Sequence, residues 1–128
     1  MATADPFAAV RRHCLAIEGV TEKLSHGAPS FFAKGTPSRS GPCFVMCQDD
    51  HHGDGILGLW VAAPPSAQEA AVAADPETFF VPPYVGHRGW LGFRLDRALD
   101  WDELAGIVED AYAEVAPPKL VEQMSRVD

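Results

Sequence analysis

Apolar residues recur at the spacing of an α-helix in two parts of the chain. In the first part this spacing links four residues, Phe7, Val10, Cys14 and Ile17. Asp5 and Pro6 predict the start of that helix, as its N-cap and its first-turn proline, and Gly19 predicts its end. An amphipathic helix that buries one face is therefore expected before Gly19.

A longer helix is predicted after residue 100. Its apolar stripe consists of Leu104, Ile107, Val108, Ala111, Tyr112 and Val115. Asp100 and Glu103 form a capping box at its start, and the Pro117-Pro118 pair ends it. The outer face is acidic and carries Glu109, Asp110 and Glu114.

Short β-rich runs separated by turn residues lie between these helices. Residues 20–27 and 29–34 are predicted as two strands, and residues 43–48 and 56–62 form the clearest hairpin. In residues 90–95, Trp90, Gly92 and Arg94 alternate with Leu91, Phe93 and Leu95, the period of a strand that has one buried face. Five strands are therefore expected, mostly paired with their neighbours in the chain.

An insertion interrupts this series. Ser66 and Glu69 predict a capping box for a short alanine-rich helix that ends at Asp75-Pro76. The break that follows contains Pro82, Pro83, Gly86 and Gly89, which stop strand pairing and turn the backbone. The order of elements predicts an α+β fold, a two-layer sandwich of antiparallel sheet with helices packed on one face.

Two stretches carry a family resemblance, FFVPPYVGHRGWLGFRL at residues 79–95 and WDELAGIVEDAYAEVAPPKL at residues 101–120. With GVTEKLSHGAPSFF and DHHGDG upstream, the chain resembles the MmcQ/YjbR family over nearly its whole length, with an extra proline at Pro118. The resemblance implies a compact fold comparable to frataxin-type (CyaY-like) and secretion-chaperone-like proteins. It also implies a double-wing DNA-binding motif. Members of the family are often labelled DNA-binding, so DNA binding is the function that the resemblance implies.

The length and composition predict that residues 1–128 form one domain that folds without disulfides. The chain is 47% hydrophobic and 22% charged, and no apolar run approaches the roughly 20 residues that span a bilayer. No secretory signal precedes the first helix, and three cysteines are an odd number. We expect a cytoplasmic monomer without a membrane partner.

The charge is distributed unevenly along the chain. Residues 1–48 hold five Lys/Arg against three Asp/Glu, whereas residues 49–128 hold five against fifteen, and the net charge is -8. So acidic a chain is repelled on average by a polyphosphate. A DNA site must therefore be a local patch.

The candidate nucleic-acid-binding residues combine aromatic and cationic side chains. They are Lys34, Arg39, Trp60, Arg88, Trp90 and Arg94. Bases stack on aromatic rings and cations contact phosphates, so this set on an uncovered sheet face suits nucleic acid. Alternatively, both tryptophans cover the edge of the core beneath flanking loops, and Arg88 pairs with a carboxylate.

A metal site is a weaker possibility, in the run DDHHGD. His51, His52 and Asp54 are the candidate ligands, whereas a hairpin tip also favours these residue types for backbone reasons. Cys43 and Cys47 on one strand are about 13 Å apart, too far to share an ion. No cofactor is expected.

No catalytic motif is present, and an enzyme is not the favoured class. Ser25 and His26 are neighbours on a strand and point to opposite faces, so they do not form a nucleophile and base pair. Tyr84 and the histidines are possible acid/base groups. The alternatives to DNA binding are an acidic frataxin-like metal-handling or protein-interaction domain, and a small-molecule-binding protein with a pocket near Trp90.

Overall fold

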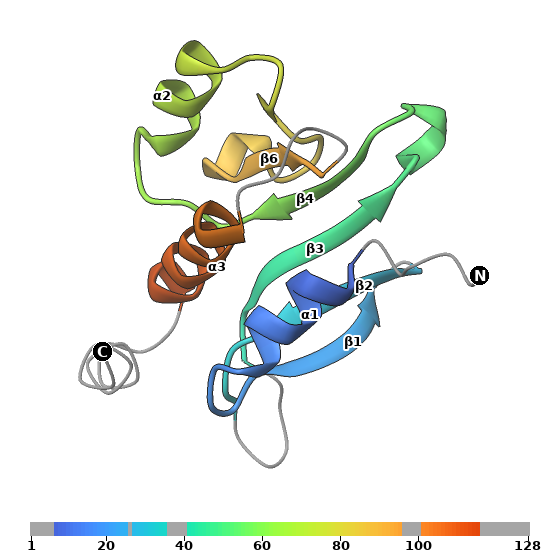
Figure 1. Ribbon diagram of the computed structural model, residues 1–128, viewed down its shortest axis with the longest axis vertical. Helices are drawn as coiled ribbons and strands as arrows, with labels where there is room; N and C mark the ends of the chain where they lie inside the picture. Colours follow the sequence, from blue (N-terminus) through green and yellow to red (C-terminus); the bar gives the residue numbers. More distant parts are fainter. Residues whose placement is uncertain (1–6, 26, 36–40, 96–100, 116–128) are drawn as a thin grey trace.

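The fold consists of one antiparallel sheet with helices. The computed structural model describes residues 7–25, 27–35, 41–95 and 101–115 (Figure 1). The sheet has six strands in the order β1-β2-β3-β4-β6-β5. Their bounds are β1 Thr21–Ser25, β2 Ala28–Phe32, β3 Cys43–Asp49, β4 Leu57–Val61, β5 Phe79–Phe80 and β6 Leu91–Arg94. The helices are α1 Ala8–Leu15, α2 Ala67–Ala74 and α3 Trp101–Val115, with 3-10 turns η1 His51–Gly53 and η2 Gly86–Arg88.

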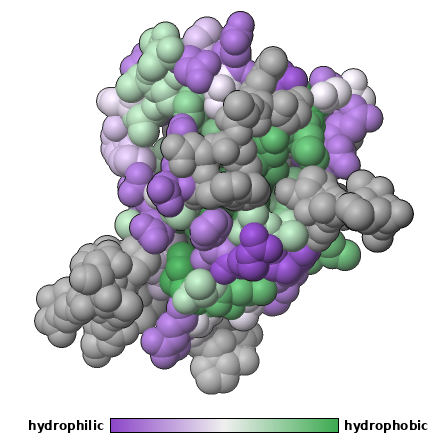
Figure 2. All heavy atoms as spheres, in the orientation of Figure 1, coloured by the Kyte–Doolittle hydropathy of each residue, from purple (hydrophilic) through white to green (hydrophobic). Residues whose placement is uncertain are grey.

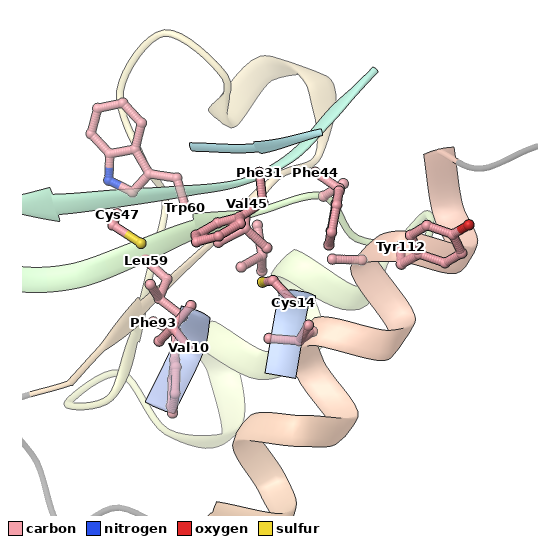
Figure 3. Packing of buried hydrophobic residues seen from close by; sticks show 14 of the residues in the cluster. Val10, Cys14, Phe31, Phe44, Val45, Cys47, Leu59, Trp60, Phe93 and Tyr112 are labelled. Carbon is pink, nitrogen blue, oxygen red and sulfur yellow. The ribbon is translucent and has the colours of Figure 1, made fainter. Parts of the chain in front are cut away.

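Two helices cover one face of the sheet. α1 and α3 contact each other, and α3 also lies against β3 and β4 (Figure 1). Figure 3 shows the side chains of Val10, Cys14 and Tyr112 meeting those of the sheet, where the Phe44 and Tyr112 rings are edge to face at 5.5 Å. The predicted two-layer α+β sandwich of antiparallel sheet and helices is therefore confirmed.

The long C-terminal helix buries the stripe that the sequence predicts. Leu104, Val108, Ala111 and Tyr112 are fully or almost fully buried, because their three- and four-residue spacing keeps them on the side facing the sheet. Glu109, Asp110 and Glu114 are exposed, as expected. This helix therefore anchors one layer of the molecule while its outer face stays acidic.

The other face of the sheet is partly covered by the insertion between β4 and β6. α2 contacts β5 but buries none of its residues, and its alanines give the pale green area at the top of Figure 2. The ring of Phe80 lies over Gly92, the residue opposite it in the β5–β6 pair. The sheet face away from α1 and α3 is thus not uniformly open.

Several boundaries differ from the predictions. The capping box at α2 is wrong, because Ser66 has a left-handed φ of 73° and its side chain makes no capping hydrogen bond. The strands predicted at residues 20–27 and 29–34 are shorter, and a two-residue strand, β5, is added. Asp5, Pro6, His26, Asp100 and Pro117-Pro118 lie outside the described residues.

The cysteines occupy the interior or its margin. Cys14 and Cys47 are buried, Cys43 is half-buried, and all three are free thiols. Cys43 and Cys47 lie on the same strand, as expected. None of the described helices has the length and apolar character that crossing a membrane would require.

Candidate nucleic-acid interface

Trp60 lies on the sheet face opposite α1 and α3. It is paired with Met46 of β3 on one side and with Gly92 of β6 on the other. Figure 3 shows its indole on the side of the sheet away from Leu59 and Val45. The alternation along β4 therefore places Trp60 on the face that the sequence predicts.

The tryptophans nevertheless do not present open rings to solvent. Trp60 and Trp90 are each only 4% exposed. They cover the edge of the core beneath neighbouring segments, which is the second of the two alternatives that the sequence left open. An indole so deeply covered offers no free face on which a base could stack.

Two aromatic side chains cover Trp60. The His51 ring, from the η1 turn between β3 and β4, packs edge to face on Trp60 at 4.8 Å and 75°. The Tyr84 ring lies 6.4 Å from Trp60 and 5.8 Å from His51. Rings from three segments of the chain therefore form one aromatic group.

Tyr84 is the exposed member of this group. Its relative exposure is 69%, and its backbone has a left-handed φ of 65°. Few residues other than glycine adopt that conformation, and bulky side chains do so rarely. The contact of Tyr84 with Trp60 could not be predicted, because neither the ring contacts nor this φ follows from strand alternation.

Arg88 is held on the second tryptophan. Its Cζ atom lies 5.5 Å from the Trp90 ring centroid, within the range of a cation–π interaction. Its backbone N–H donates to the Val85 carbonyl at 3.0 Å, and Gly89 with φ 85° closes the η2 turn. The side chain is exposed, so a guanidinium resting on an indole faces solvent.

The charge of Arg88 also reaches Cys43 at the start of β3. Burial raises the pKa of the Cys43 thiol to about 11. Hydrogen bonds to the backbone of Val45 and Phe31, and the nearby positive charge of Arg88, oppose part of this rise.

One side chain of α2 fixes the segment that carries Tyr84 and Arg88. The Gln68 amide Nε2 donates to the Gly86 carbonyl at 2.9 Å and to the Trp90 carbonyl at 2.6 Å. These two bonds join α2 to both ends of the η2 turn. The turn is thus held at two carbonyls by a single amide.

We call His51, Trp60, Tyr84, Arg88 and Trp90 the open-face cluster. The other predicted residues lie around it or apart from it. Arg94 of β6 is half-buried opposite Gly58, on the same sheet face as Trp60. Lys34 is exposed just after β2, beside Gly19, and Arg39 lies outside the described residues.

The carboxylates of the η1 turn hydrogen-bond to the backbone. Asp50 Oδ1 accepts from the Gly55 N–H at 2.7 Å, and Asp54 Oδ1 accepts from the Ile56 N–H at 2.9 Å. His51 packs on aromatic rings, and the His52 side chain is outside the described part of the chain. Within the described ranges no three His, Cys, Asp or Glu side chains gather as metal ligands would. The two aspartates therefore have the backbone role that the turn alternative gives them.

A hollow of about 230 Å³ lies next to His51, β2 and β3. Its lining consists of Phe7, Gly27, Ala28, Pro29, Cys47, Gln48, Asp49 and His51. Trp90 does not line it. This hollow is therefore not the pocket near Trp90 that would favour the small-molecule alternative.

Comparison with known proteins identifies the chain's relatives. A protein of Deinococcus radiodurans, DR2400 with the family-model domain DUF419, has a similar structure, with a TM-score of 0.71. The match covers 91% of this chain and 85% of that one at 16% sequence identity, so it shows the fold alone. No curated protein matches this chain significantly. The family model described as YjbR matches residues 15–114, and the chain therefore belongs to the YjbR family.

Proposed function

We propose that this protein binds nucleic acid through the exposed side of the open-face cluster. The observation that carries the proposal is the exposed Arg88 guanidinium, which rests on Trp90 and follows the exposed Tyr84 by four residues in the chain. A guanidinium is a strong phosphate ligand, and aromatic rings accept bases. The DNA-binding label of the family that the sequence resembles agrees with this reading.

The acidity of the chain limits the site to a small area. The net charge is -8, and the exposed face of α3 carries Glu109, Asp110 and Glu114. This helix packs on the opposite side of the sheet from Trp60 (Figures 1 and 3). A nucleic acid that contacts Arg88 therefore approaches the sheet from the side away from that acidic helix.

Fluorescence anisotropy with labelled single- and double-stranded DNA at two salt concentrations tests the proposal. The variants are Arg88→Ala and the double variant Arg88→Ala/Arg94→Ala. Arg12→Ala is the matched control, because Arg12 is an exposed arginine on α1, in the other layer. We expect wild type to bind at low salt and to weaken as salt rises.

The variants separate a local contact from a general charge effect. The slope of log affinity against log salt is negative, and each lost phosphate contact reduces its magnitude by about 0.7 to 0.9. Arg88→Ala should show such a decrease, whereas Arg12→Ala should bind like wild type. If Arg88→Ala and Arg12→Ala lose affinity for DNA equally, or if a folded wild-type sample binds no DNA at low salt, the proposal is contradicted. Protein or small-molecule partners would then be tested.

A further inference from the structure

We propose that Tyr84 is a stacking platform for one unpaired nucleobase, so that the site prefers single strands to duplexes. The inference rests on the proposed function and names the form of nucleic acid that the site takes. The two tryptophans do not fill this role, because each is only 4% exposed. Within the open-face cluster the ring that remains accessible is Tyr84, at 69% exposure.

The ring is supported from below. Trp60 lies 6.4 Å from it at 52°, and His51 lies 5.8 Å away at 84°. Trp60 itself is fixed in the sheet between Met46 and Gly92. Tyr84 is therefore an exposed ring on a buried aromatic base, and it loses less conformational freedom on binding than a ring on an unsupported loop would.

The backbone at Tyr84 adds a second and independent observation. Its φ of 65° is one that glycine adopts without cost, whereas a tyrosine there is strained. Strained residues persist where the surrounding structure holds them, and they are common at ligand sites. Folding alone would favour glycine at this position, so the presence of an exposed tyrosine points to a use for its ring.

Charged side chains near the ring distinguish where the phosphate of a bound nucleotide can lie. Arg88, four residues after Tyr84, is exposed and rests on Trp90. Asp50 and Asp54 are exposed in the turn of His51, whose ring contacts Tyr84. The phosphate of a base on Tyr84 is attracted by Arg88 and repelled by these carboxylates.

Only an unpaired base fits such a platform. The faces of a base are covered by its neighbours in a duplex, and extruding one costs unstacking energy. In a single strand the faces are available, and stacking on aromatic rings tolerates any base. One exposed ring, with one exposed cation four residues later in the chain, matches one base and its phosphate.

Anisotropy titrations with three probes of equal length test the inference. The probes are a labelled single-stranded DNA, the same backbone with every base removed, and the matching duplex. The proteins are wild type, Tyr84→Phe, which keeps the ring, Tyr84→Gly, which keeps the left-handed backbone, and Arg88→Ala. Thermal unfolding of each variant confirms that it is folded.

We expect wild type and Tyr84→Phe to bind the single strand more tightly than the duplex. Tyr84→Gly should bind the single strand about 10-fold more weakly than wild type does. It should bind the abasic strand as tightly as wild type does. Arg88→Ala should weaken binding to both strands, since the phosphates are common to them.

The two proposals fail in different ways. If wild type binds no probe, or Arg88→Ala binds every probe like wild type, the proposed function itself is wrong. If Arg88→Ala weakens binding but Tyr84→Gly binds the single strand like wild type, or loses affinity for the abasic strand to the same extent, the stacking role is wrong. Tighter binding of the duplex than of the single strand would also overturn it.

Discussion

Gly92 sits where β6 meets the rings of the insertion. It is paired with Trp60 on β4 and with Phe80 on β5. A Cβ atom on this residue would overlap the Phe80 ring, so the absence of a side chain lets that ring cover the strand. Glycine at position 92 is thus a packing requirement of the face that carries Trp60.

Replacing Gly92 with alanine should destabilise the protein by about 1–3 kcal/mol, because Phe80 must leave its place over the strand. Gly106→Ala is the matched control. Gly106 lies inside α3, and an added Cβ there meets no atom within 4 Å. That change should stabilise the protein by about 0.5–1 kcal/mol, since alanine favours helix. Urea unfolding of both variants checks this, and destabilisation of the two by the same amount would contradict it.

The buried thiols make stability depend on pH. Burial raises the pKa of Cys43 from 9.0 to about 11 and raises the pKa of Cys14 further still. The unfolded chain therefore releases these protons near pH 9.0, where the folded protein still holds them. Their contribution to stability is complete below that pH and is lost as the pH rises through the folded-state values.

Cys14→Val should reduce this loss, because valine fills the buried site without a titrating group. Between pH 8 and pH 10 the free energy of unfolding should fall by about 1 kcal/mol less in the variant than in wild type. Urea unfolding at the two pH values provides the measurement. Equal losses in variant and wild type would show that Cys14 does not contribute.

At the scale of elements, α2 depends on a single polar residue for its attachment to the η2 turn. No residue of α2 is buried, and Gln68 donates to two carbonyls that flank the turn. Removing a partner leaves two partly covered carbonyls without this donor. Gln68 is therefore a positioning residue for the segment that bears Tyr84 and Arg88.

Gln68→Ala should destabilise the protein by about 1–2 kcal/mol and speed hydrogen exchange at the amides of residues 85–90. Glu69→Ala is the control, because Glu69 is the neighbouring exposed residue on the same helix. Mass-spectrometric hydrogen exchange on both variants makes the comparison. Unchanged exchange in Gln68→Ala would mean that the turn is held by other contacts.

Periodicity predicted the elements whose burial repeats along the chain. The stripe of α3 and the β3–β4 hairpin were both predicted, because helix and strand spacing decide which side chains are buried. The capping box at Ser66 was not a reliable signal, since the backbone there turns left-handed instead of starting a regular N-cap. The two-residue strand β5 is too short to produce a recognisable alternation.

The candidate site was predicted only in part, for a related reason. Alternation placed Trp60 and Arg94 on the correct sheet face. It did not reveal that the insertion folds back over that face, because the contacts of His51 and Tyr84 with Trp60 join residues distant in sequence. The sequence alone therefore did not predict that Tyr84 is the accessible aromatic ring beside Trp60.

At the scale of the whole molecule, the acidic helix α3 and Trp60 lie on opposite sides of the sheet (Figures 1 and 3). Carboxylates are also present near the site, because Asp50 and Asp54 are exposed in the turn of His51, which packs on Trp60. The proposed function therefore requires that a protein with a net charge of -8 bind a polyanion at one local patch while most of its surface repels the polyanion. Binding should accordingly be local and sensitive to salt.

Mapping of amide chemical shifts in the ¹⁵N-labelled protein during titration with a single-stranded DNA at low salt tests the central claim most directly. The largest changes should fall on residues 84–90 and on the η1 turn, with little change in α1 and α3. Changes concentrated on α3 or on β1, or none at all in a folded sample, would contradict binding through the open-face cluster.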